Sequence, residues 1–189
     1  MVSLYFCIFA PMNYTVTTHE ATMTADEFIG RYRDVERFQA LCRQCPSFGK
    51  MWCCPPYSFD PRSVSDGFRT VKLMAATIDW DKAATGHAGQ TPGAVMQEAW
   101  QEILPQLYEM EREVPGSRCF TFRCSLCDEG CTRPEGKPCR HPGLMRHSLE
   151  SVGFDVVAML RELLDIDLDW SSDGQPPEHL TIVTALFCP

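Results

Sequence analysis

Seven cysteines in two short segments are the residues of this chain best suited to chemistry. Four of them lie within the segment CSLCDEGCTRPEGKPCRHP, and these are Cys124, Cys127, Cys131 and Cys139. Prolines and glycines break up regular structure in this segment, which is typical of a ligand loop. A C-x2-C pair lets two thiolates reach one soft or borderline metal. Four thiolates are enough for a tetrahedral zinc ion or a 4Fe–4S cluster.

The other three candidate ligands lie upstream in the segment CRQCPSFGKMWCCPP, which contains four cysteines and ends at Pro56. Cys42 and Cys45 form a second C-x2-C pair, and the adjacent cysteines Cys53 and Cys54 follow after a turn. Neighbouring side chains of an extended backbone point in opposite directions, so we expect one ligand from the adjacent pair. We therefore predict a separate site made by Cys42, Cys45 and Cys54, with Cys53 dispensable.

The spacing of the downstream cysteines favours iron and sulfide over zinc. Structural zinc sites usually pair two C-x2-C knuckles separated by 12 to 20 residues, whereas Cys131 and Cys139 follow singly, as in ferredoxin loops. We also expect the basic residues of this loop, Arg133, Lys137 and Arg140, to offset the negative charge of a cluster. Zinc stays open as the alternative. Two histidines near the cysteines, His141 and His147, are expected to be packing or surface residues rather than ligands.

The rest of the sequence predicts a scaffold of strands and helices. Strand patterns cover Tyr14–Thr18, Val71–Trp80, Arg118–Arg123 and Leu180–Phe187. Helical spacing covers Thr24–Leu41, Ala94–Glu113 with a bend at Pro105, and Leu144–Leu164 with an interruption near Gly153. We therefore expect an α+β or α/β fold with a small central sheet of about four to five strands and helices packed on it. The first helix should deliver Cys42 to its site.

Cys119 and Cys7 lie outside the ligand pattern. We expect Cys119 to be a packed strand residue and Cys7 to be either packed or unstructured. Residues 1–12 are expected to be an N-terminal extension or an edge strand, and residues 13–189 a single domain. We also expect a surface loop between Asp81 and Gly93, which is rich in glycine.

Composition narrows the class of function. The chain has 189 residues and a formal net charge of -8, which disfavours binding to nucleic acid, since that requires clustered basic residues. Clustered cysteines without a recognisable export signal suit a reducing compartment, so we expect a cytoplasmic location. The apolar opening is too short to cross a membrane, and no membrane partner is expected.

Four blocks of the sequence resemble, in the same order, the DUF2284 family of predicted metal-binding proteins. They are the block from Cys42 to Pro56, the pair Cys124-Ser-Leu-Cys127, the block Pro138-Cys-Arg-His-Pro142, and His147-Ser-Leu-Glu-Ser-Val-Gly-Phe-Asp-Val156. His147 departs from the family pattern, which has proline there, and Cys53 lies outside it. The resemblance implies a metal-binding protein but names no reaction. Family members are common in anaerobic bacteria and archaea, which suits a cluster.

Three hypotheses for function follow. The first is a protein that carries one or two 4Fe–4S clusters and acts in electron transfer, or as a redox accessory to a partner protein. The second is a structural zinc protein that presents a binding surface. The third is a metal-dependent enzyme with an open coordination position and Glu150 or Asp155 as base. The sequence has no nucleotide-binding loop and no radical S-adenosylmethionine motif, so it indicates no common organic cofactor.

Overall fold

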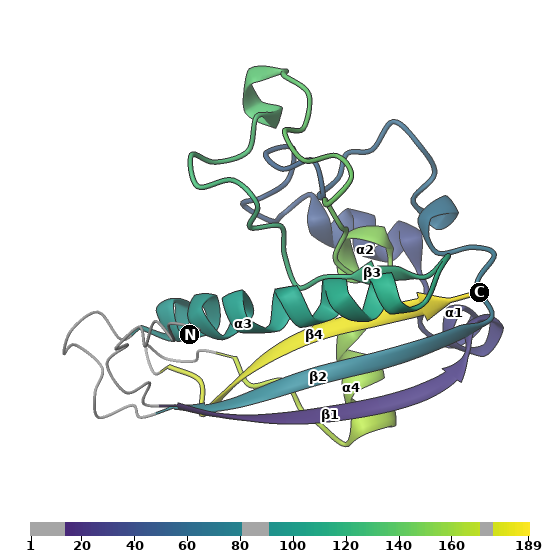
Figure 1. Ribbon diagram of the computed structural model, residues 1–189, viewed down its shortest axis with the longest axis vertical. Helices are drawn as coiled ribbons and strands as arrows, with labels where there is room; N and C mark the ends of the chain where they lie inside the picture. Colours follow the sequence, from purple (N-terminus) through teal and green to yellow (C-terminus); the bar gives the residue numbers. More distant parts are fainter. Residues whose placement is uncertain (1–13, 81–90, 171–175) are drawn as a thin grey trace, which may run out of the picture.

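A four-stranded antiparallel sheet forms the centre of the protein (Figure 1). The computed structural model describes residues 14–80, 91–170 and 176–189. The strands lie in the order β1-β2-β4-β3, and their bounds are β1 (Tyr14–Thr24), β2 (Thr70–Trp80), β3 (Arg118–Phe120) and β4 (His179–Cys188). The predicted α+β class and all four predicted strands are confirmed. Predictions for Cys7, for residues 1–12 and for most of the loop after Asp81 lie outside the described residues.

The sheet lies between two layers of helix. The helices are α1 (Ala25–Tyr32), α2 (Val35–Cys42), α3 (Pro92–Glu113) and α4 (Val156–Leu164). Side chains alternate along β4, so Val183, Ala185 and Phe187 pack with α1 and α4, whereas Ile182 and Leu186 pack with α3. Figure 1 shows α3 on one face of the sheet and α4 on the other. No described helix is both long enough and apolar enough to cross a membrane.

The predicted helix from Thr24 to Leu41 is in fact two helices. Thr24 caps α1 as expected, because its hydroxyl accepts the Glu27 N–H at 3.3 Å. The helix then stops at Arg33, which forms an isolated antiparallel bridge with Phe154. The long-range bridge replaces the helical hydrogen bonds that local spacing predicted. The prediction that a helix delivers Cys42 is confirmed, since α2 ends at that residue.

The predicted helix from Leu144 is also shorter than expected. Only a 3-10 turn at Glu150–Val152 precedes α4, which begins at Val156. The helix starts there because Asp155 caps it, with its carboxylate accepting the Ala158 N–H at 3.0 Å. Gly153 directly follows the 3-10 turn. Its φ is 104°, a left-handed conformation that ends the turn.

Gly153 is also the point at which this turn contacts α2. A β-carbon at Gly153 would lie 2.7 Å from the Cα of Val35. The Gly153 carbonyl accepts the Asp34 N–H at 2.8 Å. The start of α2, and therefore the position of Cys42, depends on a glycine at this place.

We predict that Gly153→Ala destabilises the fold strongly. The left-handed conformation costs about 1–2 kcal/mol for alanine, and the overlap with Val35 adds about 1–3 kcal/mol. Urea unfolding should show the combined loss. Gly30→Ala is the matched control, because nothing lies within 4 Å of a β-carbon at that helical position. The control should be neutral or more stable, by up to ~1 kcal/mol. Equal stability of the two variants would contradict the contact.

Candidate metal centre

The two cysteine segments lie side by side above β3 and α2, away from the main body of the sheet (Figure 1). The first segment leaves the C-terminal end of α2, and the second follows β3. Both are irregular, as predicted from their prolines and glycines. The sheet and helices therefore act as a platform that holds two loops against each other.

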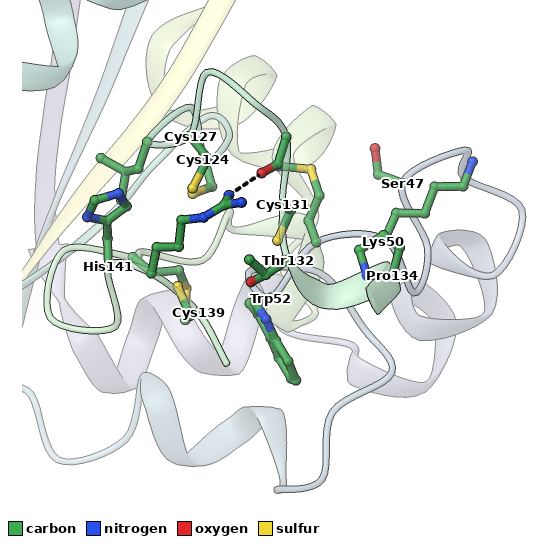
Figure 2. Close-up of a pocket in the computed structure, with 15 residues that line it drawn as sticks. Ser47, Lys50, Trp52, Cys124, Cys127, Cys131, Thr132, Pro134, Cys139 and His141 are labelled. Carbon is green, nitrogen blue, oxygen red and sulfur yellow. Dashed lines mark hydrogen bonds between the residues drawn. The ribbon is translucent and has the colours of Figure 1, made fainter. Parts of the chain in front are cut away.

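The four cysteines of the second segment line one cavity of about 430 Å³. Figure 2 shows Cys124, Cys127, Cys131 and Cys139 around this space, with Trp52 of the first segment at its edge. All four side chains are partly exposed and none is in a disulfide. We call this space the cysteine cavity. By residue type this donor set suits a metal held by thiolates, because all four cysteines line the same cavity.

Metal-ligand geometry itself is not formed by the side chains. Within residues 14–80, 91–170 and 176–189, no three His, Cys, Asp or Glu side chains are arranged so that they could hold a metal ion. The four predicted ligands therefore line one cavity, but their side chains are not placed as they would be around a bound metal ion.

The three predicted ligands of the first segment also lie near one another. Burial raises the pKa of Cys42, and the nearby Cys45 thiol adds to this effect. The hydrogen bond from Cys53 lowers the pKa of Cys54, and the Arg133 guanidinium acts in the same direction. Cys54 is therefore the member of the adjacent pair that holds a thiolate more easily.

Cys53 lies at the junction of the two segments, which the sequence did not indicate. Its sulfur is 3.9 Å from that of Cys54, so the expectation that the two side chains diverge is wrong. Its hydrogen bond with Cys124 lowers the pKa of Cys53, but the bond with Cys54 and burial outweigh it and raise the value to about 12. The irregular backbone after Trp52 has no strand alternation, so the two sulfurs can lie together.

A single arginine of the second segment binds the backbone of the first. The Arg133 guanidinium donates to the carbonyl oxygens of Met51, at 2.7 Å, and of Cys54 and Pro56. It also lies over the Trp52 ring, 5.2 Å from the ring centroid. The Trp52 indole N–H returns a hydrogen bond to the Lys137 carbonyl at 3.1 Å. We call this set of contacts the arginine clamp.

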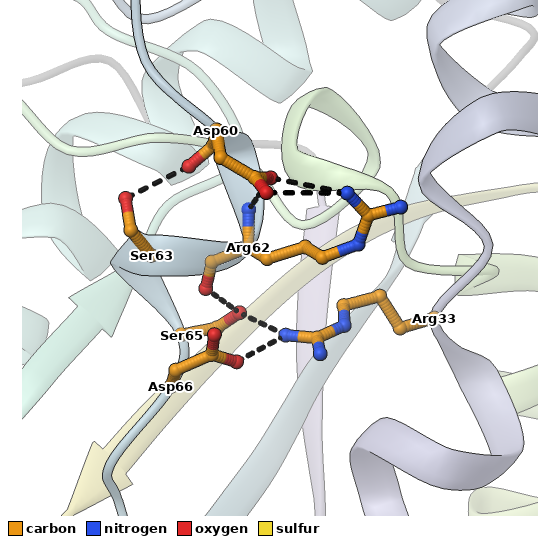
Figure 3. A network of polar contacts seen from close by, with 6 residues as sticks. All are labelled: Arg33, Asp60, Arg62, Ser63, Ser65 and Asp66. Atoms are coloured by element: carbon orange, nitrogen blue, oxygen red, sulfur yellow. Dashed lines mark hydrogen bonds and ion pairs between the residues drawn. The ribbon is translucent and has the colours of Figure 1, made fainter.

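The chain beyond the first segment is held by a second arginine. Arg33, between α1 and α2, donates to the Ser65 hydroxyl at 3.2 Å and pairs with Asp66 at 2.6 Å (Figure 3). Ser65 is fully buried and donates in turn to the Arg62 carbonyl. Asp60 caps this turn by accepting the Arg62 N–H at 2.9 Å. The network ties the loop exit to the same helix junction that positions Cys42.

A largely buried ion pair holds the end of the second segment. Arg146 binds both carboxylate oxygens of Glu111 on α3, with nitrogen-to-oxygen distances of 2.5–3.1 Å. The Glu111 carboxylate also accepts the Cys119 backbone N–H at 2.8 Å. Cys119 is completely buried in β3, as predicted, and burial raises the pKa of its thiol. Sequence reasoning missed this pair, because its partners are 35 positions apart.

The basic residues of the second segment have different roles. Arg140 lines the cysteine cavity, and its interaction with the Cys127 thiol raises the pKa of the guanidinium. Arg133 forms the clamp, and Lys137 pairs with Glu135 at 2.7 Å. Lys50 of the first segment lines the cavity instead. Of the three loop cations expected to offset the charge of a cluster, Arg140 is the one that lines the cysteine cavity.

The other candidate residues of the sequence analysis also lie in different places and have different roles. His141 lines the cysteine cavity, whereas His147 is buried beside Tyr57 and lines a neighbouring cavity. Asp155 caps α4 and pairs with Arg37 at 2.9 Å, which gives it a structural role. Burial raises the pKa of Glu150, whose backbone carbonyl faces the Cys42 sulfur at 4.0 Å.

We predict that Arg133→Lys loosens the first segment while the sheet stays folded. Lysine cannot reach three carbonyls at once, and each hydrogen bond from a charged donor contributes about 1.5–3 kcal/mol. Hydrogen exchange of peptides covering residues 47–56 should accelerate roughly 10- to 100-fold. The control Arg112→Lys changes an exposed pair on α3 and should leave that exchange unchanged. Unchanged exchange in the Arg133 variant would disprove the clamp.

The comparisons with known proteins place the chain in one family. Residues 31–187 match the sequence pattern of DUF2284, described as a predicted metal-binding protein. No curated protein and no solved structure matches the chain significantly. The match spans the cysteine segments, the clamp and all described helices except most of α1. The chain is therefore a member of the DUF2284 family of predicted metal-binding proteins.

Proposed function

We propose that this protein binds a 4Fe–4S cluster in the cysteine cavity and serves in electron transfer, as a carrier or as an accessory to a partner enzyme in the cytoplasm. The observation that carries the proposal is the placement of Cys124, Cys127, Cys131 and Cys139 around one cavity of about 430 Å³. Thiolates from one loop are the usual ligands of such clusters.

The cavity has room for a cluster. A structural zinc ion bonds four thiolates at about 2.3 Å, so the sulfurs pack directly around it and need no further space. A cluster adds inorganic sulfide and several iron atoms between the cysteines, and it requires room. The cysteine cavity provides that room between the two segments.

Charge and shielding support the same proposal. A cluster bound by four thiolates is anionic, and Lys50 and Arg140 line the cavity. Trp52 and Met145 supply apolar surface on its wall. Such surroundings tune a reduction potential by controlling charge and access of solvent. When bound, the cluster would accept and release electrons, while these side chains offset its charge and exclude water.

The first segment supports a second centre through Cys42, Cys45 and Cys54. Cys45 lies close enough to Cys42 and to Cys54 to raise the pKa of each, and Arg133 acts on Cys54 in the opposite direction. Three thiolates would leave one position for a further ligand. Cys53 links this group to Cys124 by hydrogen bonds, so the two centres would be neighbours.

Metal content decides between iron and zinc. We expect protein purified without oxygen to be brown, to contain iron and acid-labile sulfide, and to lose its visible absorption with dithionite. The double variant Cys124→Ser with Cys127→Ser should lose the iron of the cysteine cavity and melt at a lower temperature, because metal binding and loop folding are coupled. Cys188→Ser, in the last strand, is the control and should keep its iron. Stoichiometric zinc in a colourless anaerobic preparation would favour the structural zinc protein instead.

The adjacent cysteines provide a separate test. We predict that Cys54→Ser removes the first segment's share of the metal, whereas Cys53→Ser keeps the metal content. The burial of Cys53 means that serine there also costs stability, of the order of 1–2 kcal/mol, so iron should be counted per folded chain. Loss of metal from Cys53→Ser but not Cys54→Ser would reverse the assignment, and no loss from either would leave the cysteine cavity as the single centre.

A further inference from the structure

A second cavity, of about 330 Å³, lies beside the cysteine cavity and shares Trp52, Cys139 and Met145 with it. Aromatic side chains form much of its wall. Tyr57 and Phe59 stack with their ring centroids 4.8 Å apart. Each of them also forms a T-shaped contact with the His147 ring, at centroid distances of 5.1 Å for Tyr57 and 5.9 Å for Phe59. The size is within the range of small-molecule sites. We call this space the aromatic cavity.

His147 places an unused hydrogen-bond acceptor in this cavity. Its Nδ1 lies 3.1 Å from the Cys53 carbonyl oxygen and 3.2 Å from the Tyr57 hydroxyl. The Tyr57 hydroxyl itself donates to the same carbonyl at 2.6 Å. Both neighbours of Nδ1 are thus acceptors, so Nδ1 carries the proton. Burial lowers the pKa of His147, which keeps the ring neutral and leaves Nε2 as an acceptor.

His147 is only 4% exposed, so the partners of its Nε2 atom have to be accounted for. This atom forms no hydrogen bond with any described residue. Among those residues, Tyr14 Oη is the only fully buried side-chain nitrogen or oxygen that lacks a partner. Nε2 therefore has some accessible surface, and the cavity lined by His147 provides it.

Arg133 contributes a positive charge to the same wall. The Arg133 guanidinium has five N–H donors, and the arginine clamp uses three of them. Two of these three are on one terminal nitrogen and one is on the other. No carboxylate of the described residues pairs with it. Two N–H donors and an uncompensated charge therefore remain for a bound anion.

We propose that the aromatic cavity binds a planar aromatic carboxylate that bears a hydroxyl group. The ring lies against Phe59 and Trp52, the carboxylate binds Arg133, and the hydroxyl donates to Nε2 of His147. The aromatic wall selects a flat ring, while the charge and the acceptor select its two substituents. A ligand in this place lies across Cys139 from the cysteine cavity. This binding proposal does not rest on the proposed function.

The first test measures binding of small probes to the full-length protein purified without oxygen. Calorimetry or ligand-observed NMR would compare benzoate, the three hydroxybenzoates and cyclohexanecarboxylate. We expect at least one hydroxybenzoate to bind roughly 2- to 10-fold more tightly than benzoate, as one added hydrogen bond allows. We expect the saturated ring to bind more weakly than benzoate. Equal binding of benzoate and cyclohexanecarboxylate, or no binding of either, would overturn the proposal.

Two variants assign the contacts. Phe59 is 42% exposed, so Phe59→Leu should fold normally and weaken benzoate roughly 2- to 10-fold, as loss of a ring contact predicts. Leu144→Ala, an exposed apolar residue outside the lining, is the matched control and should leave binding unchanged. Equal effects of these two variants would also overturn the proposal.

His147→Asn tests the acceptor. Its amide N–H replaces the Nδ1–H bond to Cys53, but Nε2 is lost. The preference for hydroxybenzoate over benzoate should fall to about one, with benzoate itself bound as before. A retained preference would refute the role of Nε2. If this variant does not fold, the Phe59 comparison still decides the site. Iron counted in the same preparations tests the proposed function separately, because a zinc-loaded protein that binds hydroxybenzoate would refute the cluster and keep the cavity.

Discussion

The guanidinium group of Arg133 is the contact on which the arrangement of both cysteine segments depends. Irregular loops cannot satisfy their own backbone groups as a helix or strand does, and ordering each residue costs about 1–2 kcal/mol of conformational entropy. Arg133 satisfies three carbonyls of the first segment from the second, and the Trp52 indole returns a bond to the second. Where these hydrogen bonds join the two segments, Cys53, Cys54 and Cys124 lie close together. Each segment is therefore ordered largely by the other.

The sheet and helices limit where these loops can lie. Arg33 holds the exit of the first segment to the α1–α2 junction, and Arg146 holds the end of the second to Glu111 on α3. Gly153 lets the turn before α4 approach the start of α2, which ends at Cys42. Both loops are thus fixed at their ends by contacts between distant parts of the chain.

The two cavities on this platform have complementary chemistry. The cysteine cavity presents soft sulfur ligands with Lys50 and Arg140, and the aromatic cavity presents flat rings with one acceptor and one cation. Trp52, Cys139 and Met145 separate them. Arg133 serves both, because it orders the backbone around the cysteines and lines the second cavity. Arg133 therefore connects the two cavities, whereas Phe59 lines only the aromatic cavity and Cys127 only the cysteine cavity.

The sequence by itself determined the strands, the irregular cysteine loops, the cap at Thr24 and the delivery of Cys42 by a helix. These features follow from local rules, namely side-chain alternation, helical spacing, capping and the restrictions of proline and glycine. The sequence also indicated the family and the cysteines that are predicted to bind a metal. The tertiary structure alone decided the break at Arg33, the central position of Cys53 and the contact of Arg133 with the first segment. Each of these depends on a partner far away in the chain, such as Phe154 for Arg33 or Cys124 for Cys53, and local spacing carries no information about such partners.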